Sequence, residues 1–151
     1  MEKLCPVLFR NAGMGRELLV FRHPSAGIQL VKGTREAGEP REAGALRELA
    51  EESGISTAVV IGELGASATI AAGEVWHFVQ VQAGPLPDRW DFDTAGGGGL
   101  RFSFFWWPLG DDPGPDWPLR FVRALHHIRA RAGFPALEGP KPTWCYRLST
   151  C

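Results

Sequence analysis

The stretch GTREAGEPREAGALRELAEESGI, residues 33–55, determines which fold to expect of this chain. It holds good helix formers at helical spacing, which predicts a helix over residues 40–53. At 100° per residue, Glu48, Glu51 and Glu52 fall within about 100° of one another, and the leucines gather on the opposite side. The helix is therefore expected to pack through one face and to present an acidic face on the other.

Three carboxylates within a turn and a half of helix repel one another by about 0.2–0.5 kcal/mol per pair. An ordinary exposed charged helix would be more stable with these charges spread out. A divalent cation explains the crowding, because Mg²⁺ takes oxygen ligands, keeps several waters and binds substrate phosphates. The segment predicts a site for Mg²⁺, with Mn²⁺ as an alternative, beside an open cleft.

The same stretch fits the Nudix box, GX5EX7REUXEEXGU with U a bulky aliphatic residue, at every fixed position. The fixed positions hold Gly33, Glu39, Arg47, Glu48, Leu49, Glu51, Glu52, Gly54 and Ile55. A pattern of this length is far more specific than a lone short motif, and on it the chain resembles the Nudix hydrolases. The resemblance implies a Nudix-like α/β/α sandwich with a central mixed β-sheet.

The resemblance also implies an activity and its residues. The expected reaction is Mg²⁺-dependent hydrolysis of a phosphoanhydride bond in a nucleoside diphosphate derivative or a nucleoside polyphosphate. Glu48, Glu51 and Glu52 are implied to be catalytic residues and metal ligands. Glu39 is implied to contribute variably as a ligand, and the carbonyl group of Gly33 to join the ligands in some members.

Arg47 is counted with the catalytic residues, but its expected task is orientation. A planar guanidinium can pair with two carboxylates at once and so fix the loop bearing Glu39 against the helix. Gly54 is expected to end the helix as the C′ residue. Gly44 lies mid-helix, where glycine costs about 0.5–1 kcal/mol relative to alanine. It either leaves room near the metal site or is neutral drift, and we favour drift.

Runs of β-branched, aromatic and leucine residues predict strands on both sides of this helix. They cover residues 4–10, 18–23, 28–31, 58–64, 75–82 and 102–107, the first two forming a hairpin. Loops are expected over residues 84–93, 96–99 and 108–115. A second helix is expected to follow Asp116 as N-cap, with Pro118 in its first turn, and to run to about residue 132.

This order of strands, helix, strands and helix predicts one α+β domain over residues 1–151, with an irregular tail from about residue 133. The net charge is −1, which gives no field for attracting nucleic acid. No apolar run is long enough to span a membrane or to serve as a signal peptide, so the expected location is the cytoplasm. The three cysteines are expected to be free thiols. The protein is expected to be a monomer or a homodimer.

The substrate is expected to be a small nucleotide-type molecule. Lys32 and Arg22 are candidates for phosphate contacts. Trp76 and Trp106 are candidates to stack on a nucleobase, although core packing is the commoner role of any single aromatic residue. The alternative function is a Nudix-like domain that senses a nucleotide without cleaving it. Such domains usually lose box carboxylates, and here all are present, which favours an enzyme.

Overall fold

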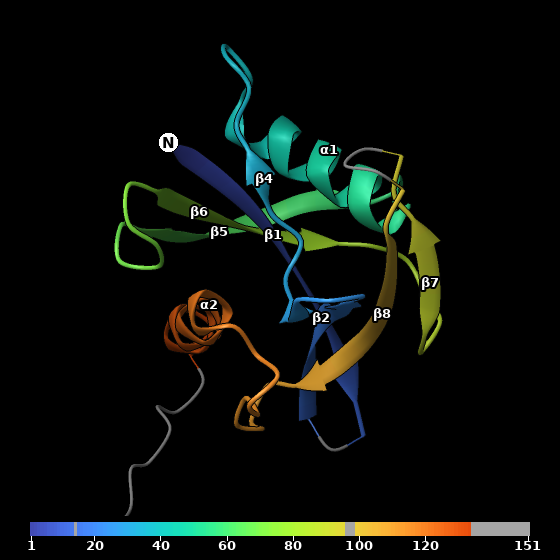
Figure 1. Cartoon of the computed structure of the whole chain (residues 1–151). Helices are drawn as coiled ribbons and strands as arrows, with labels where there is room; N and C mark the ends of the chain where they lie inside the picture. The colour runs from blue at the N-terminus through green and yellow to red at the C-terminus, as the bar shows by residue number, and fades with distance from the viewer. Residues whose placement is uncertain (14, 96–98, 134–151) are drawn as a thin grey trace, which may run out of the picture.

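The computed structural model describes residues 1–13, 15–95 and 99–133 (Figure 1). Its strands are β1 (Glu2–Ala12), β2 (Gly15–His23), β3 (Gly27–Gln29), β4 (Gly33–Thr34), β5 (Val59–Ser67), β6 (Val75–Gln82), β7 (Trp90–Asp93) and β8 (Arg101–Pro108), and its helices are α1 (Arg41–Ser53) and α2 (Leu119–Arg131). Within these ranges no helix has the length and apolar character needed to cross a membrane. Cys5 is a buried free thiol, whereas Cys145, Cys151 and the expected tail lie outside the described residues.

The sheet is mixed, as the sequence predicts. Its strand order is β5-β6-β1-β2-β8-β7, with β3 beside β2 and β4 beside β1. β1 pairs with β6 in parallel, and the other described pairings are antiparallel. Residues 2–8 of β1 pair with β6, and residues 9–12 pair with β2 in the expected hairpin. This one long strand therefore joins the two halves of the sheet.

Each face of the sheet is covered by one helix and has its own apolar core. On one face α2 packs through Phe121 and Leu125 against a core that contains Trp76. On the other face α1 packs through Leu49 against a core that contains Phe104. Figure 1 shows the two helices on opposite sides of the strands. The arrangement confirms the expected α+β class and the α/β/α sandwich.

Two expectations about short elements are wrong. Residues 90–93, placed in a loop, form β7 at the edge of the sheet, where they pair with β8. A four-residue edge strand carries too little alternation to be recognised from sequence. Asp116 does not cap α2, because the cap position is held by Pro118. Asp116 instead accepts the N–H of Ile28 through its carbonyl oxygen at 3.0 Å and pairs with Arg22 at 2.9 Å.

The two tryptophans expected to stack on a nucleobase are core residues. Trp76 has no exposed surface, and its ring centroid lies 5.7 Å from that of Phe121. Trp106 is 8% exposed, and its indole N–H donates to the carbonyl oxygen of Pro87 at 3.1 Å. The Cζ atom of Arg10 lies 4.5 Å from the centroid of the Trp106 ring. Trp76 has no surface for a base, so the stacking expectation is wrong for this residue. Trp106 lines a cavity of about 500 Å³ that also contains residues of β1 and of the segment after β6, and none of the box glutamates lines it.

Replacing Trp76 with alanine should therefore affect the fold before it affects any ligand. Removing a buried Trp side chain costs about 3–5 kcal/mol in the free energy of unfolding, and urea denaturation followed by circular dichroism measures this loss. Leu119→Ala, at an exposed position of α2, is the control and should change stability by less than about 0.5 kcal/mol. A Trp76→Ala protein with unchanged stability would contradict the core assignment.

Candidate functional site

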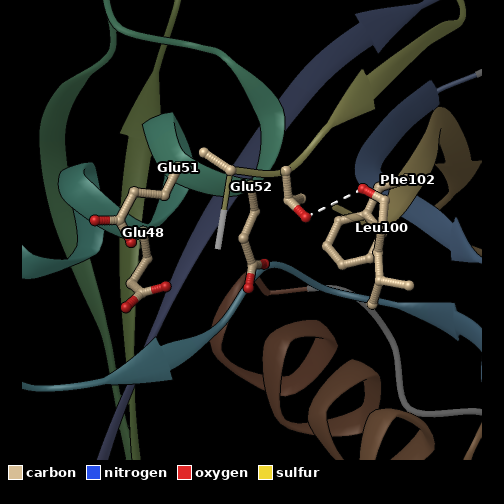
Figure 2. Close-up of a pocket in the computed structure, with 7 residues that line it drawn as sticks. Glu48, Glu51, Glu52, Leu100 and Phe102 are labelled. Atoms are coloured by element: carbon tan, nitrogen blue, oxygen red, sulfur yellow. Dashed lines mark hydrogen bonds between the residues drawn. The ribbon is translucent and has the colours of Figure 1, made fainter. Parts of the chain in front are cut away.

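The acidic face of α1 forms one wall of a pocket of about 590 Å³ (Figure 2). That wall is made of Glu48, Glu51 and Glu52. The other lining residues come from the segment after β7 and from the start of β8, and they are Thr94, Ala95, Leu100 and Phe102. The volume lies in the range of small-molecule sites. The fold thus places three carboxylates opposite a largely apolar wall.

The apolar wall was missed by the sequence analysis. Phe102 stacks on Phe21 with ring centroids 4.2 Å apart, which holds its ring at the pocket edge. Leu100 is 36% exposed, and its carbonyl oxygen accepts the backbone N–H of Thr94 at 2.9 Å. This contact holds Thr94, which follows β7, beside Leu100, which precedes β8. The only sequence signal was Leu100 and Phe102 shortly after the glycine run of residues 96–99, which does not indicate what these side chains face.

Arg47 makes the contacts that the sequence predicts. Its Nε and Nη2 donate to the two carboxylate oxygens of Glu39 at 2.7 and 3.0 Å. Its Nη1 donates to Glu48 Oε1 at 2.8 Å and to Glu51 Oε2 at 3.2 Å. The two-pronged bond to Glu39 ties the loop before α1 to the helix, and the other contacts orient the pocket carboxylates.

Two glycines make room for this network. The carboxylate of Glu48 occupies the space that a side chain on Gly33 would need. A Cβ atom on Gly44 would collide with Leu4 and with a carboxylate oxygen of Glu39. The interpretation of Gly44 as neutral drift is therefore wrong, because any side chain there would displace Glu39 from its place beside the helix.

The carboxylates differ in their affinity for protons. The hydrogen bond from Arg47 lowers the pKa of Glu39 to about 2. Burial raises the pKa of Glu48 and raises that of Glu52 to about 8, with the charge of Glu48 as the second cause for Glu52. Glu52 Oε2 is buried and has no hydrogen-bond partner among the described residues. In the described part of the pocket, this buried oxygen is the one that still needs a proton or a cation.

The residues fit a divalent cation in their chemistry. Carboxylates are hard oxygen donors, Glu52 Oε2 lacks a partner, and the backbone of Gly33 lies against Glu48. Among the described residues, however, no three His, Cys, Asp or Glu side chains are arranged to hold an ion as they stand. Mg²⁺ commonly takes one or two carboxylates and completes its shell with waters and phosphates, which suits such a site.

Not every expected site residue reaches this pocket. Glu39 is engaged with Arg47 and does not line it. Lys32 is partly buried, with its Nζ 5.7 Å from the Trp76 ring centroid, and burial lowers its pKa while the nearby charge of Glu52 opposes the shift. Arg22 lines a separate cavity of about 400 Å³ between β2 and β7. The structure therefore supports Lys32, but not Arg22, as a neighbour of the carboxylates.

A family model described as a NUDIX domain matches residues 5–101 of the chain. No curated protein matches the chain. A UDP-X diphosphatase structure aligns with a TM-score of 0.60 at 12% identity over 90% of this chain and 64% of that chain, so the present chain spans less than two thirds of its length. The Nudix hydrolase RenU from M. smegmatis aligns with a TM-score of 0.59 at 18% identity over 91% and 89% of the two chains.

The NUDIX domain of Shewanella oneidensis NrtR, crystallised with ADP ribose, aligns with a TM-score of 0.55 at 17% identity over 87% of this chain and 88% of that chain. NrtR has also been crystallised with a 27mer DNA. Identities this low establish a shared fold. They leave open the activity and the ligand, which must be argued from the pocket itself.

The raised pKa of Glu52 predicts a pH dependence of stability. An unfolded glutamate releases its proton near pH 4.5, whereas Glu52 in the fold keeps it up to about pH 8. At a pH between these two values, unfolding releases this proton. The contribution of Glu52 to the free energy of unfolding is therefore complete below about pH 4.5 and is lost as the pH rises toward 8. In EDTA, the melting temperature of the unmodified protein should fall more steeply from pH 5 to pH 8 than that of Glu52→Gln. Parallel curves would contradict the assignment.

Proposed function

The chain belongs to the Nudix family, and from that premise we propose that it hydrolyses a phosphoanhydride bond in a nucleoside diphosphate derivative or nucleoside polyphosphate, with Mg²⁺ as its cation. Nudix hydrolases generally use divalent metal ions. The observation that carries the proposal is that Glu48, Glu51 and Glu52 share one wall of a pocket whose other wall is largely apolar. An acidic wall suits a cation and phosphates, and an apolar wall suits the remainder of the substrate.

Glu48, Glu51 and Glu52 are the residues proposed to hold the cation. When bound, it would neutralise charge on the phosphate oxygens and make water a better nucleophile. Glu51 is the most accessible of the three, with 57% of its side chain exposed. Arg47 keeps Glu48 and Glu51 in place through its Nη1 while Glu39 engages its Nε and Nη2. The chain thus orients its carboxylates before any substrate arrives, which lowers the cost of ordering them during the reaction.

The apolar wall is proposed to receive the part of the substrate that carries no phosphate. Leu100 and Phe102 offer aliphatic and aromatic surface, and among the described residues the three glutamates are the only charged side chains that line the pocket. Nucleotide-linked ligands named for proteins of the same fold, such as ADP ribose, combine phosphates with flat or weakly polar groups. A ligand of this class matches both walls.

The test is a screen of nucleoside diphosphate derivatives and nucleoside polyphosphates for hydrolysis products, with Mg²⁺ present and after EDTA treatment. Glu51→Gln or Glu52→Gln should lower turnover by about a hundredfold, because each removes a charged oxygen donor from the metal site. Glu42→Gln, at an exposed position in the first turn of the same helix, is the matched control and should retain full activity. Equal activity in all three variants would contradict the metal assignment.

The same screen tests the sensing alternative, which the likeness to NrtR keeps in view. Thermal unfolding with added ADP-ribose reports binding without cleavage. A protein that is stabilised by ADP-ribose and cleaves no compound in the panel with any divalent cation would overturn the hydrolase proposal in favour of sensing.

Leu100→Ala tests the apolar wall. The change removes about 1 kcal/mol of apolar contact and should raise KM about fivefold with little change in kcat, because this contact is equally strong before and during bond cleavage. Val59→Ala, at an exposed position on β5, serves as the control and should leave KM unchanged. Steady-state kinetics on the best substrate of the screen measures both. A fall in kcat with constant KM would place Leu100 near the reacting phosphate instead.

A further inference from the structure

The carboxylate of Glu2, at the start of β1, joins three donors from other parts of the chain. Its Oε2 accepts from Arg35 Nη1 at 2.8 Å. Its Oε1 accepts from His77 Nε2 at 3.0 Å and from Arg41 Nη2 at 3.4 Å. A carboxylate only accepts, so His77 must donate from Nε2. Glu2 thereby connects β1 to the segment after β4, to β6 and to the start of α1.

Arg35 extends this connection to the loop that carries Glu39. The backbone N–H of Arg35 donates to the carbonyl oxygen of Glu2 at 3.0 Å. Its Nε donates to the carbonyl oxygen of Glu39 at 2.7 Å while its Nη1 holds the Glu2 carboxylate. One planar guanidinium thus bridges the first strand and the end of the loop, and a lysine could not make both bonds in this geometry.

Arg47 is the next member of the chain of contacts. Its Nε and Nη2 are engaged by Glu39, and its Nη1 already touches both Glu48 and Glu51. If Glu39 moved away, the released N–H groups of Nε and Nη2 would turn to the other carboxylates around Arg47, of which Glu48 and Glu51 lie closer to its Nη1 than Glu36 does, at 2.8 and 3.2 Å against 3.7 Å. Each new bond would occupy an oxygen that a cation needs.

We propose that Glu2 is a positioning residue for the metal site: acting through Arg35, it holds Glu39 against Arg47 and so keeps Nε and Nη2 of Arg47 from turning toward the pocket glutamates, which Arg47 contacts through Nη1 alone. The inference rests on the proposed function, in which Glu48 is a metal ligand. Glu2 does not line the pocket, and it lies 46 positions before Glu48 in the sequence. Its effect is expected on the affinity for Mg²⁺ rather than on the bond-breaking step.

The experiment measures thermal unfolding of the full chain during a titration with Mg²⁺ alone. Glu2→Gln should raise the Mg²⁺ concentration for half-maximal stabilisation by about fivefold, somewhat below the 10–100-fold typical of residues that contact a metal ligand directly. Arg35→Lys keeps a charge beside Glu2 but cannot hold both Glu2 and the Glu39 carbonyl group, and should give a similar rise. Saturating Mg²⁺ should restore kcat in both variants.

Arg41→Ala is the matched control. Among the described residues Arg41 pairs only with Glu2, at 3.4 Å, so its loss should leave the Mg²⁺ affinity within about twofold. If Glu2→Gln and Arg35→Lys lower the melting temperature in EDTA but leave the Mg²⁺ affinity unchanged, the network is only structural and the inference is overturned. If the unmodified protein itself shows no stabilisation by Mg²⁺ and no hydrolysis, the proposed function and this inference both fail.

Discussion

The acidic pocket depends on the placement of one guanidinium group, that of Arg47. Four glutamates lie within 4 Å of this group, Glu36 and Glu39 from the loop before α1 and Glu48 and Glu51 from the helix. Charges of one sign crowded together destabilise the helix unless they are compensated. Arg47 binds Glu39 through two parallel hydrogen bonds, the strongest geometry available to this pair. It reaches Glu48 and Glu51 through a single nitrogen. The loop is thereby fastened to the helix, while the pocket glutamates stay oriented and keep oxygens for a ligand.

This placement is possible only because the surrounding backbone leaves space for it. Gly33 admits the carboxylate of Glu48 against β4, and Gly44 admits Glu39 against α1. The cost of a mid-helix glycine, about 0.5–1 kcal/mol, is offset by a charged pair that packs against bare backbone. At Gly33, a fixed position of the box, and at Gly44, which is not one, the absence of a side chain provides the space that the glutamates occupy.

The sequence predicted the fold and the acidic wall of the pocket, because both follow from local patterns. Helical spacing alone places Glu48, Glu51 and Glu52 together. The apolar wall depends instead on the pairing of β7 with β8, which brings Leu100 beside α1, and a four-residue edge strand has no recognisable pattern of its own. Strand alternation also could not decide the role of Trp76, because both faces of this sheet are covered by helices.

Glu52 is a residue that stability alone would not favour in this pocket. A buried polar atom without a partner costs about 1–3 kcal/mol, and Glu52 Oε2 is such an atom in the described part of the chain. The charge of Lys32 lowers the pKa of Glu52, but burial outweighs it. An apolar side chain would pack at this position without that cost. A proton or a hard cation can satisfy the oxygen, and because they compete for one lone pair, a cation must displace the proton that burial favours.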